Sequence, residues 1–319
     1  MSKKEAIWMI SVVVVVIGAF YYYMKYIYKP TPKQPAEVLA ANSASGPAGT
    51  VEWQEWLLPD ELKEISANVF QDDTHMACID DNEGIIYIYN LQSKRIDDKI
   101  RFAGKGDYEG LAKVQNTWYV LRSDGFLYEV QPGSKDPAVK TVDLPLGVEN
   151  DTESLCYDSA HNRLLIGVKE KDLTEQDKKG FYSFDLKTRK MNTNAVFYIE
   201  SSYNSEDKEE KDKHNDQEKA KDKDKSGKGK DKKKKKGDAE IKPSGIAINP
   251  ANSELYILDG PSSRLFIADA TGNIRSKIQL DKKIFPQPEG LCFNSKGDLY
   301  ISSEAGKNEQ GVIVKFKPD

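Results

Sequence analysis

From about residue 60 onward, apolar and polar residues alternate in short runs that Gly, Asn, Asp and Ser turns separate. A period of two is typical of β-strands, and helical periodicity is nearly absent from this part of the chain. One phrase recurs: a Glu or Ser and a small residue, an apolar strand, a polar turn and a second strand. PEGLCFNSKGDLYISSE, which begins at Pro288, is an example. The pattern predicts an all-β fold built from repeats.

The phrase occurs five times, and each copy begins at an anchoring residue. The anchors are Ser66, Glu109, Glu153, Ser244 and Glu289, at intervals of 43, 44, 91 and 45 residues. Candidates for a third and a fourth strand follow most copies, and four strands in about 40–45 residues are the signature of a propeller blade. We predict a β-propeller of five four-stranded blades over residues 51–319, or of six if a divergent blade is hidden. A β-sandwich, the alternative fold, does not predict the same phrase five times.

The last repeat ends in GVIVKFKPD and has no candidate for an outer strand. The stretch TVEWQEWLLP at residues 50–59, which precedes the first repeat, could supply that strand. We expect this pairing to close the ring.

The N-terminus has a different pattern. Residues 6–24 contain no charged residue, and such a run is close to the roughly 20 residues that a helix needs to cross a bilayer. A cleaved signal peptide is the alternative, but tyrosines and Lys25 follow the run instead of a small-residue cleavage site. We predict a membrane anchor over residues 1–29, one transmembrane helix, and a flexible linker rich in Pro, Ala, Ser and Gly over residues 30–50. The protein is expected to be single-pass in the cell (plasma or inner) membrane, with an extracytoplasmic propeller, although lysines flank the run almost equally on both sides.

The interval of 91 residues contains a segment that cannot form a core. Residues 201–240 almost lack apolar side chains and include five consecutive lysines at 232–236. Such a composition buries too little apolar surface to order the chain, so we predict a disordered, charged surface insertion. Contact of the lysines with an anionic lipid or polymer is the alternative role.

The charge and the cysteine content argue against some classes of function. The formal net charge is −4, and the N-terminal segment and the insertion are themselves basic, so the remaining residues are more acidic than the total. An acidic domain argues against a nucleic-acid partner and favours cations. The three cysteines, Cys78, Cys156 and Cys292, each lie in a predicted strand without close metal-ligand spacing. They are expected to be buried small hydrophobic residues rather than disulfides or reactive thiols.

The repeats also resemble a known family. LLPDELKEISA, YEGLA, ESLCYD with GVKE, PSGIAINPANSELYILD and FPQPEGLCFNSKGDLYISSE, in this order, resemble the SdiA-regulated propeller family over about residues 51–319. The resemblance implies a propeller, often behind an N-terminal membrane anchor or signal, with a poorly defined biochemical role. It also implies a distant similarity to NHL-type propellers and to calcium-dependent lactonases and esterases. Ala67 and Ser154 depart from the glycine that usually follows the anchor.

The anchoring residues suggest a site. In a propeller the first strand of each blade lines the central channel, so Glu109, Glu153 and Glu289 should converge at one mouth, with Ser66 and Ser244 between them. Converging carboxylates repel each other unless a cation or protons intervene, and oxygen ligands favour Ca²⁺ or Mg²⁺ over softer metals. A calcium site at the channel mouth is the prediction. The alternative is that each Glu accepts hydrogen bonds from a neighbouring blade.

The second strand of each blade returns to the same mouth, and its last residues should form a mixed-charge rim. The residues that we expect to line the rim or contact a ligand there are Ser66, Ser244, Asp80, Arg122, Lys169, Glu170, Asp259 and Glu304. A solvated surface without a ligand is the alternative.

No histidine is expected near these carboxylates, because His75 and His161 lie in turns at the opposite end and His214 lies in the insertion. Catalytic motifs such as GxSxG and HExxH are also missing from the sequence. We therefore expect a binding or scaffolding module for a protein or a small molecule, rather than an enzyme. The alternative is a calcium-dependent esterase or lactonase-like hydrolase that uses metal-bound water.

Overall fold

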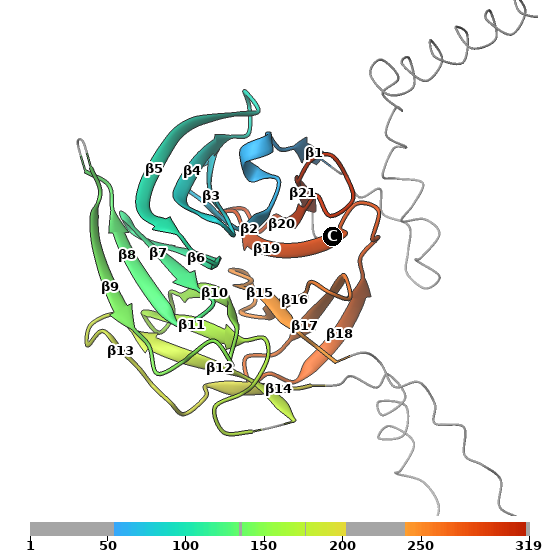
Figure 1. Cartoon of the computed structure of the whole chain (residues 1–319). Helices are drawn as coiled ribbons and strands as arrows, with labels where there is room; N and C mark the ends of the chain where they lie inside the picture. The colour runs from blue at the N-terminus through green and yellow to red at the C-terminus, as the bar shows by residue number, and fades with distance from the viewer. Residues whose placement is uncertain (1–53, 134–135, 176, 202–239, 317–319) are drawn as a thin grey trace, which may run out of the picture. The chain divides into compact units, whose positions relative to one another are not determined.

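The computed structural model describes residues 54–133, 136–175, 177–201 and 240–316. These residues form an all-β propeller of five blades, which confirms the predicted fold class and the count of five (Figure 1). Within the described ranges, no helix has the length and apolar character to span a membrane. The predicted anchor over residues 1–29, the linker over 30–50 and most of the insertion over 201–240 lie outside the described residues.

Each blade is an antiparallel sheet whose strands follow one another from the channel outward. The first blade contains β2 (Ile65–Phe70), β3 (His75–Asp80), β4 (Glu83–Asn90) and β5 (Arg95–Lys105). The second contains β6 (Tyr108–Val114), β7 (Thr117–Arg122), β8 (Phe126–Gln131) and β9 (Ala138–Asp143). The fourth contains β15 (Pro243–Ile248), β16 (Leu255–Asp259), β17 (Arg264–Ala268) and β18 (Ile274–Gln279).

The third blade departs from this plan at its outer edge. It contains β10 (Thr152–Asp158), β11 (Arg163–Val168), β12 (Lys178–Asp185), β13 (Lys190–Met191) and β14 (Phe197–Glu200). The short strands β13 and β14 both pair with β12, at different parts of its length. The predicted fourth strand AVFYIE therefore shares the edge position with a second segment of the chain.

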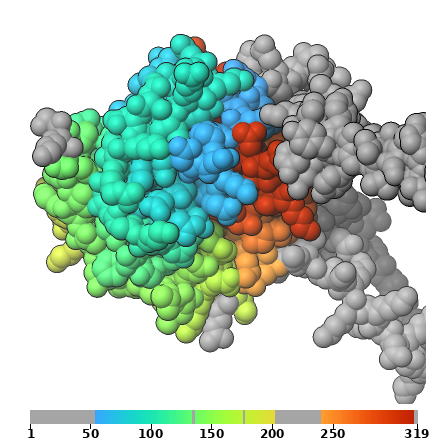
Figure 2. All heavy atoms as spheres, turned by 45° about the horizontal axis from the view of Figure 1, so that its top comes forward, coloured from blue at the N-terminus to red at the C-terminus, as the bar shows by residue number. Residues whose placement is uncertain are grey.

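The fifth blade combines the two ends of the domain. It contains β19 (Gln287–Phe293), β20 (Leu299–Glu304), β21 (Val312–Phe316) and, as its outer strand, β1 (Gln54–Leu57). Gln54 lies opposite Lys315 and Leu57 opposite Val312 in antiparallel register, and the blue and red ends of the domain are adjacent on the surface (Figure 2). The residues before the first repeat thus close the ring, as the sequence predicted. The short 3₁₀ helix η2 (Asp60–Leu62) connects β1 to β2.

The core lies between the blades rather than inside one. Each of five clusters of buried side chains joins residues from two neighbouring blades, so that Tyr89 of the first blade packs in one cluster with Cys292 and Ile313 of the fifth. This arrangement explains the apolar alternation, because most inner strands bury side chains on both faces. All three cysteines are buried and free, as expected.

Candidate functional site

Each inner strand carries a β-bulge at its anchoring residue. The pairing register between first and second strand shifts around Ser66, Glu109, Glu153 and Ser244, and in the fifth blade around Glu289 and Gly290. A bulge adds one residue opposite the partner strand and redirects its side chain, and such bulges are common next to functional sites. The recurrent Glu or Ser therefore lies at a bulge, and its side chain does not follow the regular alternation of the strand.

The two serine anchors hold neighbouring blades together. Ser66 Oγ donates a hydrogen bond of 2.7 Å to the carbonyl oxygen of Tyr108, and Ser244 Oγ donates one of 2.9 Å to that of Pro288. Both serines are buried, and each acceptor immediately precedes the anchor of the next blade. Of the five anchors, the serines thus have a clear structural contact across a blade interface.

The three glutamate anchors line one small cavity in the channel. Glu109, Glu153 and Glu289 surround a volume of about 10 Å³, roughly what one water molecule needs. Burial is the main cause that raises the pKa of Glu109 and of Glu289. The negative charges of Glu153 and Asp107 raise the pKa of Glu109 further, and those of Glu109, Glu304 and Glu153 raise the pKa of Glu289. The structure thus brings the three predicted residues together around one cavity. The cavity is so small that their carboxylates, when charged, repel one another at close range.

One cation reaches into this group. Lys169 Nζ donates a hydrogen bond to Glu153 Oε1 and lies 3.6 Å from Asp151 Oδ2. Burial still holds the pKa of Glu153 at about 7, whereas attraction to Glu153, Asp151 and Glu109 raises the pKa of Lys169 against the effect of its own burial. Glu153 Oε2 is buried and has no hydrogen-bond partner in the described part of the chain. One lysine thus compensates only part of the negative charge.

Glu289 connects the cavity to the rim. Gln287 Nε2 donates a hydrogen bond of 2.8 Å to Glu289 Oε1. The negative charge of Glu304 is also one of the causes that raise the pKa of Glu289, so the two carboxyl groups interact. Burial raises the pKa of Glu304 to about 7, and the negative charges of Glu64 and Asp81 act in the same direction. Carboxyl groups therefore continue from the buried cavity to the surface.

A tight acidic group lies at the outer end of this path. One carboxylate oxygen each from Glu64, Asp81 and Glu304 lies within 4.8 Å of the others, and among the described residues this is the group of His, Cys, Asp and Glu close enough to share a metal ion. Glu64 is exposed, Asp81 is half-buried and Glu304 is buried. We use the name carboxylate mouth for the end of the channel formed by Glu64, Asp81, Glu109, Glu153, Glu289 and Glu304.

Glu64 was not among the residues predicted from the sequence, although the repeats carry a signal for it. Glu64 stands two residues before its anchor, and all five blades have a polar residue at that position: Glu64, Asp107, Asp151, Lys242 and Gln287. In the first three blades the carbonyl oxygen of this residue accepts a hydrogen bond from the backbone N–H of the first residue after the second strand. The donors are Asp81, Ser123 and Lys169. The position is thus repeated in the fold as well as in the sequence.

The other predicted rim residues differ in their surroundings. Glu304 is part of the carboxylate mouth, and Lys169 lies beside it. Glu170 is near Asp151 and pairs with Lys242. Arg122 instead pairs with Asp124 of its own blade at 2.7 Å, and its guanidinium lies over Phe126.

Two further rim residues have contacts within their own blades. Asp259 accepts a hydrogen bond of 2.7 Å from Arg264 Nε. Asp80 accepts one of 3.2 Å from the backbone N–H of Glu83, and burial raises its pKa to about 6. These two carboxylates, like Arg122, have local structural partners.

The described histidines pair elsewhere. His75 lies within 3.1 Å of Asp97 and Asp72, and His161 lies 2.7 Å from Asp158. Both belong to the hairpins at the opposite end of the inner strands from the anchors. The carboxylate mouth therefore has Glu, Asp and a neighbouring Lys, but no described His, as its titratable groups.

Comparison with known proteins agrees with this architecture. A family model described as SdiA-regulated matches residues 60–307, whereas no curated protein matches the sequence. The crystal structure of Myxococcus xanthus glutaminyl cyclase is similar with a TM-score of 0.51 and 13% identity, over 83% of this chain and 94% of that one. A streptogramin B lyase structure has a TM-score of 0.46 and 10% identity, over 84% of this chain and 98% of that one. At 13% identity the likeness to the glutaminyl cyclase shows the fold alone.

Proposed function

The chain belongs to the SdiA-regulated family, and from this premise we propose that its propeller is a binding module that holds a calcium ion at the carboxylate mouth. The observation that carries the proposal is the incomplete compensation of charge. Six carboxyl groups converge there, the half-buried Lys169 supplies an ammonium group beside them, and one oxygen of Glu153 is buried without a partner in the described residues.

The spacing of the outer group fits a hard cation. Calcium takes oxygen ligands at about 2.3–2.6 Å, so one ion can contact oxygens that lie up to ~5 Å apart. The carboxylate oxygens of Glu64, Asp81 and Glu304 lie within 4.8 Å of one another. They come from different blades or from the connection between blades, which gives an irregular set that suits calcium better than the strict octahedron of magnesium. Glu289, whose pKa the charge of Glu304 raises, is then the next carboxylate toward the channel interior.

The same proposal includes the cellular setting. The uncharged run at residues 6–24 would anchor the chain in the cell membrane, and residues 30–50 would tether the propeller outside the cytoplasm. Calcium sites of extracellular modules have dissociation constants of about 10⁻⁴–10⁻³ M. We expect an affinity in that range, because two of the three outer ligands remain accessible to water. The calcium-bound mouth would then present a polar surface to a protein or small-molecule partner.

The test is a calcium titration followed by thermal unfolding. An ion that binds the folded chain alone stabilises it by about 2.7 kcal/mol at a hundredfold excess over the dissociation constant. We expect a calcium-dependent rise in Tm that Glu304→Gln and Asp81→Asn abolish. Glu254→Gln is the matched control, because Glu254 lies in the hairpin between β15 and β16, at the end away from the anchors. A wild-type Tm that calcium leaves unchanged contradicts the proposal.

A second candidate is a calcium-dependent hydrolase of the esterase or lactonase type. One observation favours it: Glu153 lines a cavity for about one water molecule, and its pKa of about 7 suits a general base at neutral pH. Hydrolysis of simple esters and lactones by the calcium-loaded protein, lost in Glu153→Gln with folding intact, supports this activity. Calcium binding without any such hydrolysis leaves the binding module as the function.

A further inference from the structure

The channel has a second chamber, separated from the carboxylate mouth by an apolar layer. Leu111, Leu155, Ile246 and Leu291 each lie two residues after their anchors and line both the small acidic cavity and a larger one beyond it. Asn68 holds the equivalent position in the first blade, and its amide is engaged by Cys292 Sγ and Ser302 Oγ. The side chains of this layer, which lies between the two cavities, are therefore uncharged.

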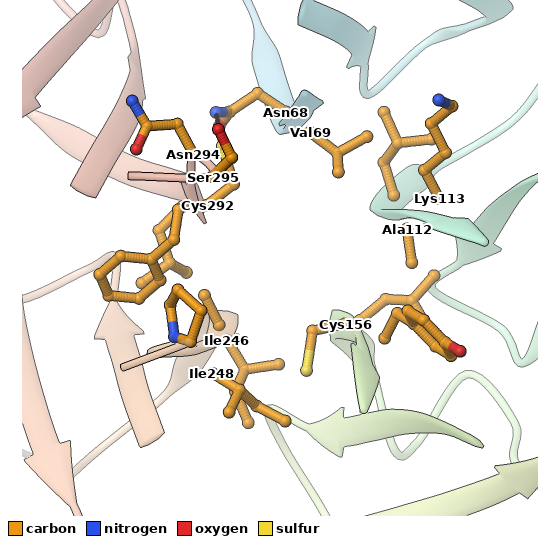
Figure 3. Close-up of a pocket in the computed structure, with 17 residues that line it drawn as sticks. Asn68, Val69, Ala112, Lys113, Cys156, Ile246, Ile248, Cys292, Asn294 and Ser295 are labelled. Carbon is orange, nitrogen blue, oxygen red and sulfur yellow. Dashed lines mark hydrogen bonds between the residues drawn. The ribbon is translucent and has the colours of Figure 1, made fainter. Parts of the chain in front are cut away.

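The larger chamber is an open funnel of about 280 Å³ at the far end of the channel (Figure 3). Val69, Ala112, Cys156, Ile246 and Ile248 point toward its centre from four blades. Its volume lies near the lower end of the range for ligand pockets, which are concave, mostly apolar and equipped with few polar groups. The funnel thus has the dimensions for a small ligand with an apolar body.

The charge of this funnel is opposite to that of the carboxylate mouth. Its lining contains no Asp or Glu, and Lys113 is its charged residue. Lys113 Nζ donates a hydrogen bond of 3.0 Å to the carbonyl oxygen of Gln71, and no carboxylate among the described residues forms an ion pair with it. An ammonium group has three donors, so the one bond to Gln71 leaves donors for an anionic group at the rim.

The polar side chains of Asn294 and Tyr157, which also line the funnel, have hydrogen-bond partners of their own. Asn294 Nδ2 donates to Asp298 Oδ2 at 2.9 Å, and Tyr157 donates to Asn162 Oδ1 at 3.2 Å. Burial raises the pKa of the thiols of Cys156 and Cys292 well above its usual range, so both remain neutral. The funnel therefore offers a ligand the apolar side chains of the inner strands, the hydroxyl of Ser295 and one cation at its edge.

We propose that this funnel binds a small amphipathic carboxylate, with its hydrocarbon part against the inner strands and its carboxylate on Lys113. Burial of one methylene contributes about 0.8 kcal/mol, so affinity should rise about fourfold per CH₂ until the funnel is filled. The ion pair with the half-buried Lys113 should contribute about three- to tenfold, since charge-assisted hydrogen bonds exceed neutral ones. The site is separate from the calcium site proposed above and does not depend on it.

The experiment is a calorimetric titration of the full chain in EDTA with butanoate, hexanoate, octanoate and 1-octanol. We expect saturable binding of octanoate that is tighter than that of the shorter acids and of the alcohol. Lys113→Met should weaken octanoate by about three- to tenfold and leave 1-octanol unchanged. Lys140→Met, on the exposed outer strand β9 of the same blade, is the matched control and should bind as wild type.

A second variant keeps the test independent of Lys113. Val69 is half-buried and points into the funnel, so Val69→Phe should fill the space and weaken both octanoate and octanol at an unchanged Tm. The proposal is overturned if octanoate does not bind saturably at millimolar concentration. It is also overturned if 1-octanol binds as well as octanoate, or if both variants bind octanoate as the wild type does.

Discussion

Lys169 donates a hydrogen bond to one carboxylate oxygen of Glu153, while the other oxygen of Glu153 is buried without a partner in the described chain. The ion pair forms between the end of β11 and the bulge of β10, inside one blade. It places a cation beside the cavity that Glu109 and Glu289 also line. The carboxylate mouth is therefore partly neutralised by the protein itself, and the remaining charge must be met by protons or by a bound cation.

Removal of Lys169 should destabilise the folded protein, because it leaves the charge of Glu153 uncompensated. Loss of one partner of a buried ion pair leaves an uncompensated charge, and Glu153 is 4% exposed. We expect Lys169→Met to lower the free energy of unfolding by about 2–3 kcal/mol at pH 8 and by much less at pH 5, where Glu153 is protonated. Urea denaturation at both pH values measures the difference. Lys242→Met is the control, because its pair with Glu170 is more exposed and should contribute about 1 kcal/mol or less. Equal losses at the two pH values would argue against this account.

The pH dependence of wild-type stability follows from the same carboxyl groups. Glu153 and Glu304 have a pKa of about 7 in the folded protein and 4.5 as the ordinary value. Because the folded state binds these protons more tightly, their stabilising effect is full below about pH 4.5 and is lost as pH rises through 7. In EDTA we expect Tm to fall between pH 5 and pH 8, and millimolar calcium to reverse the fall at pH 8. A Tm that rises over this interval in EDTA would mean that the mouth carboxylates are not strained.

Close packing of the inner strands explains the small residue that follows the anchor in each blade. A Cβ added to Gly245 would lie 2.2 Å from the carbonyl oxygen of Glu289 in the next inner strand. We expect Gly245→Ala to cost about 1–3 kcal/mol of unfolding free energy, because the inner strands would have to separate. Gly104→Ala is the control, since a Cβ there meets no atom within 4 Å. Chemical denaturation of both variants is the measurement, and an unaffected Gly245→Ala would show that the inner ring is looser than described.

The serine anchors should affect stability without affecting calcium. Ser244→Ala removes the hydrogen bond to the carbonyl oxygen of Pro288 and leaves that buried acceptor unsatisfied. A loss of about 1 kcal/mol is expected, and Ser66→Ala should give a similar loss through Tyr108. The calcium-dependent rise in Tm should stay as in wild type for both. A variant that folds normally but no longer responds to calcium would assign the serines to the metal site instead.

Most of the fold could be predicted because the repeat is encoded locally. The five anchors, the alternation after them and the missing outer strand near the C-terminus predicted five blades and the closing role of β1. The edge of the third blade was less predictable. There β13 and β14 divide one edge between them, and period-two alternation cannot reveal such a division in strands as short as Lys190–Met191.

The site was predictable only in part, since ligation depends on distances across blades. The sequence placed Glu109, Glu153 and Glu289 at one mouth, and the structure puts all three around one cavity. It could not show that Ser66 turns its hydroxyl to the next blade, or that Glu64 from the connection after η2 approaches Glu304 from the last hairpin. That approach requires closure of the ring, which joins residues far apart in the sequence.

The most direct test of the calcium proposal is a crystal structure of the protein grown with calcium and then soaked with a lanthanide for anomalous diffraction. The account predicts an anomalous peak coordinated by Glu64, Asp81 and Glu304, with oxygen distances of about 2.3–2.6 Å, and the loss of that peak in Glu304→Gln. A well-ordered mouth with no peak, or a peak only at carboxylates elsewhere on the propeller, would contradict it.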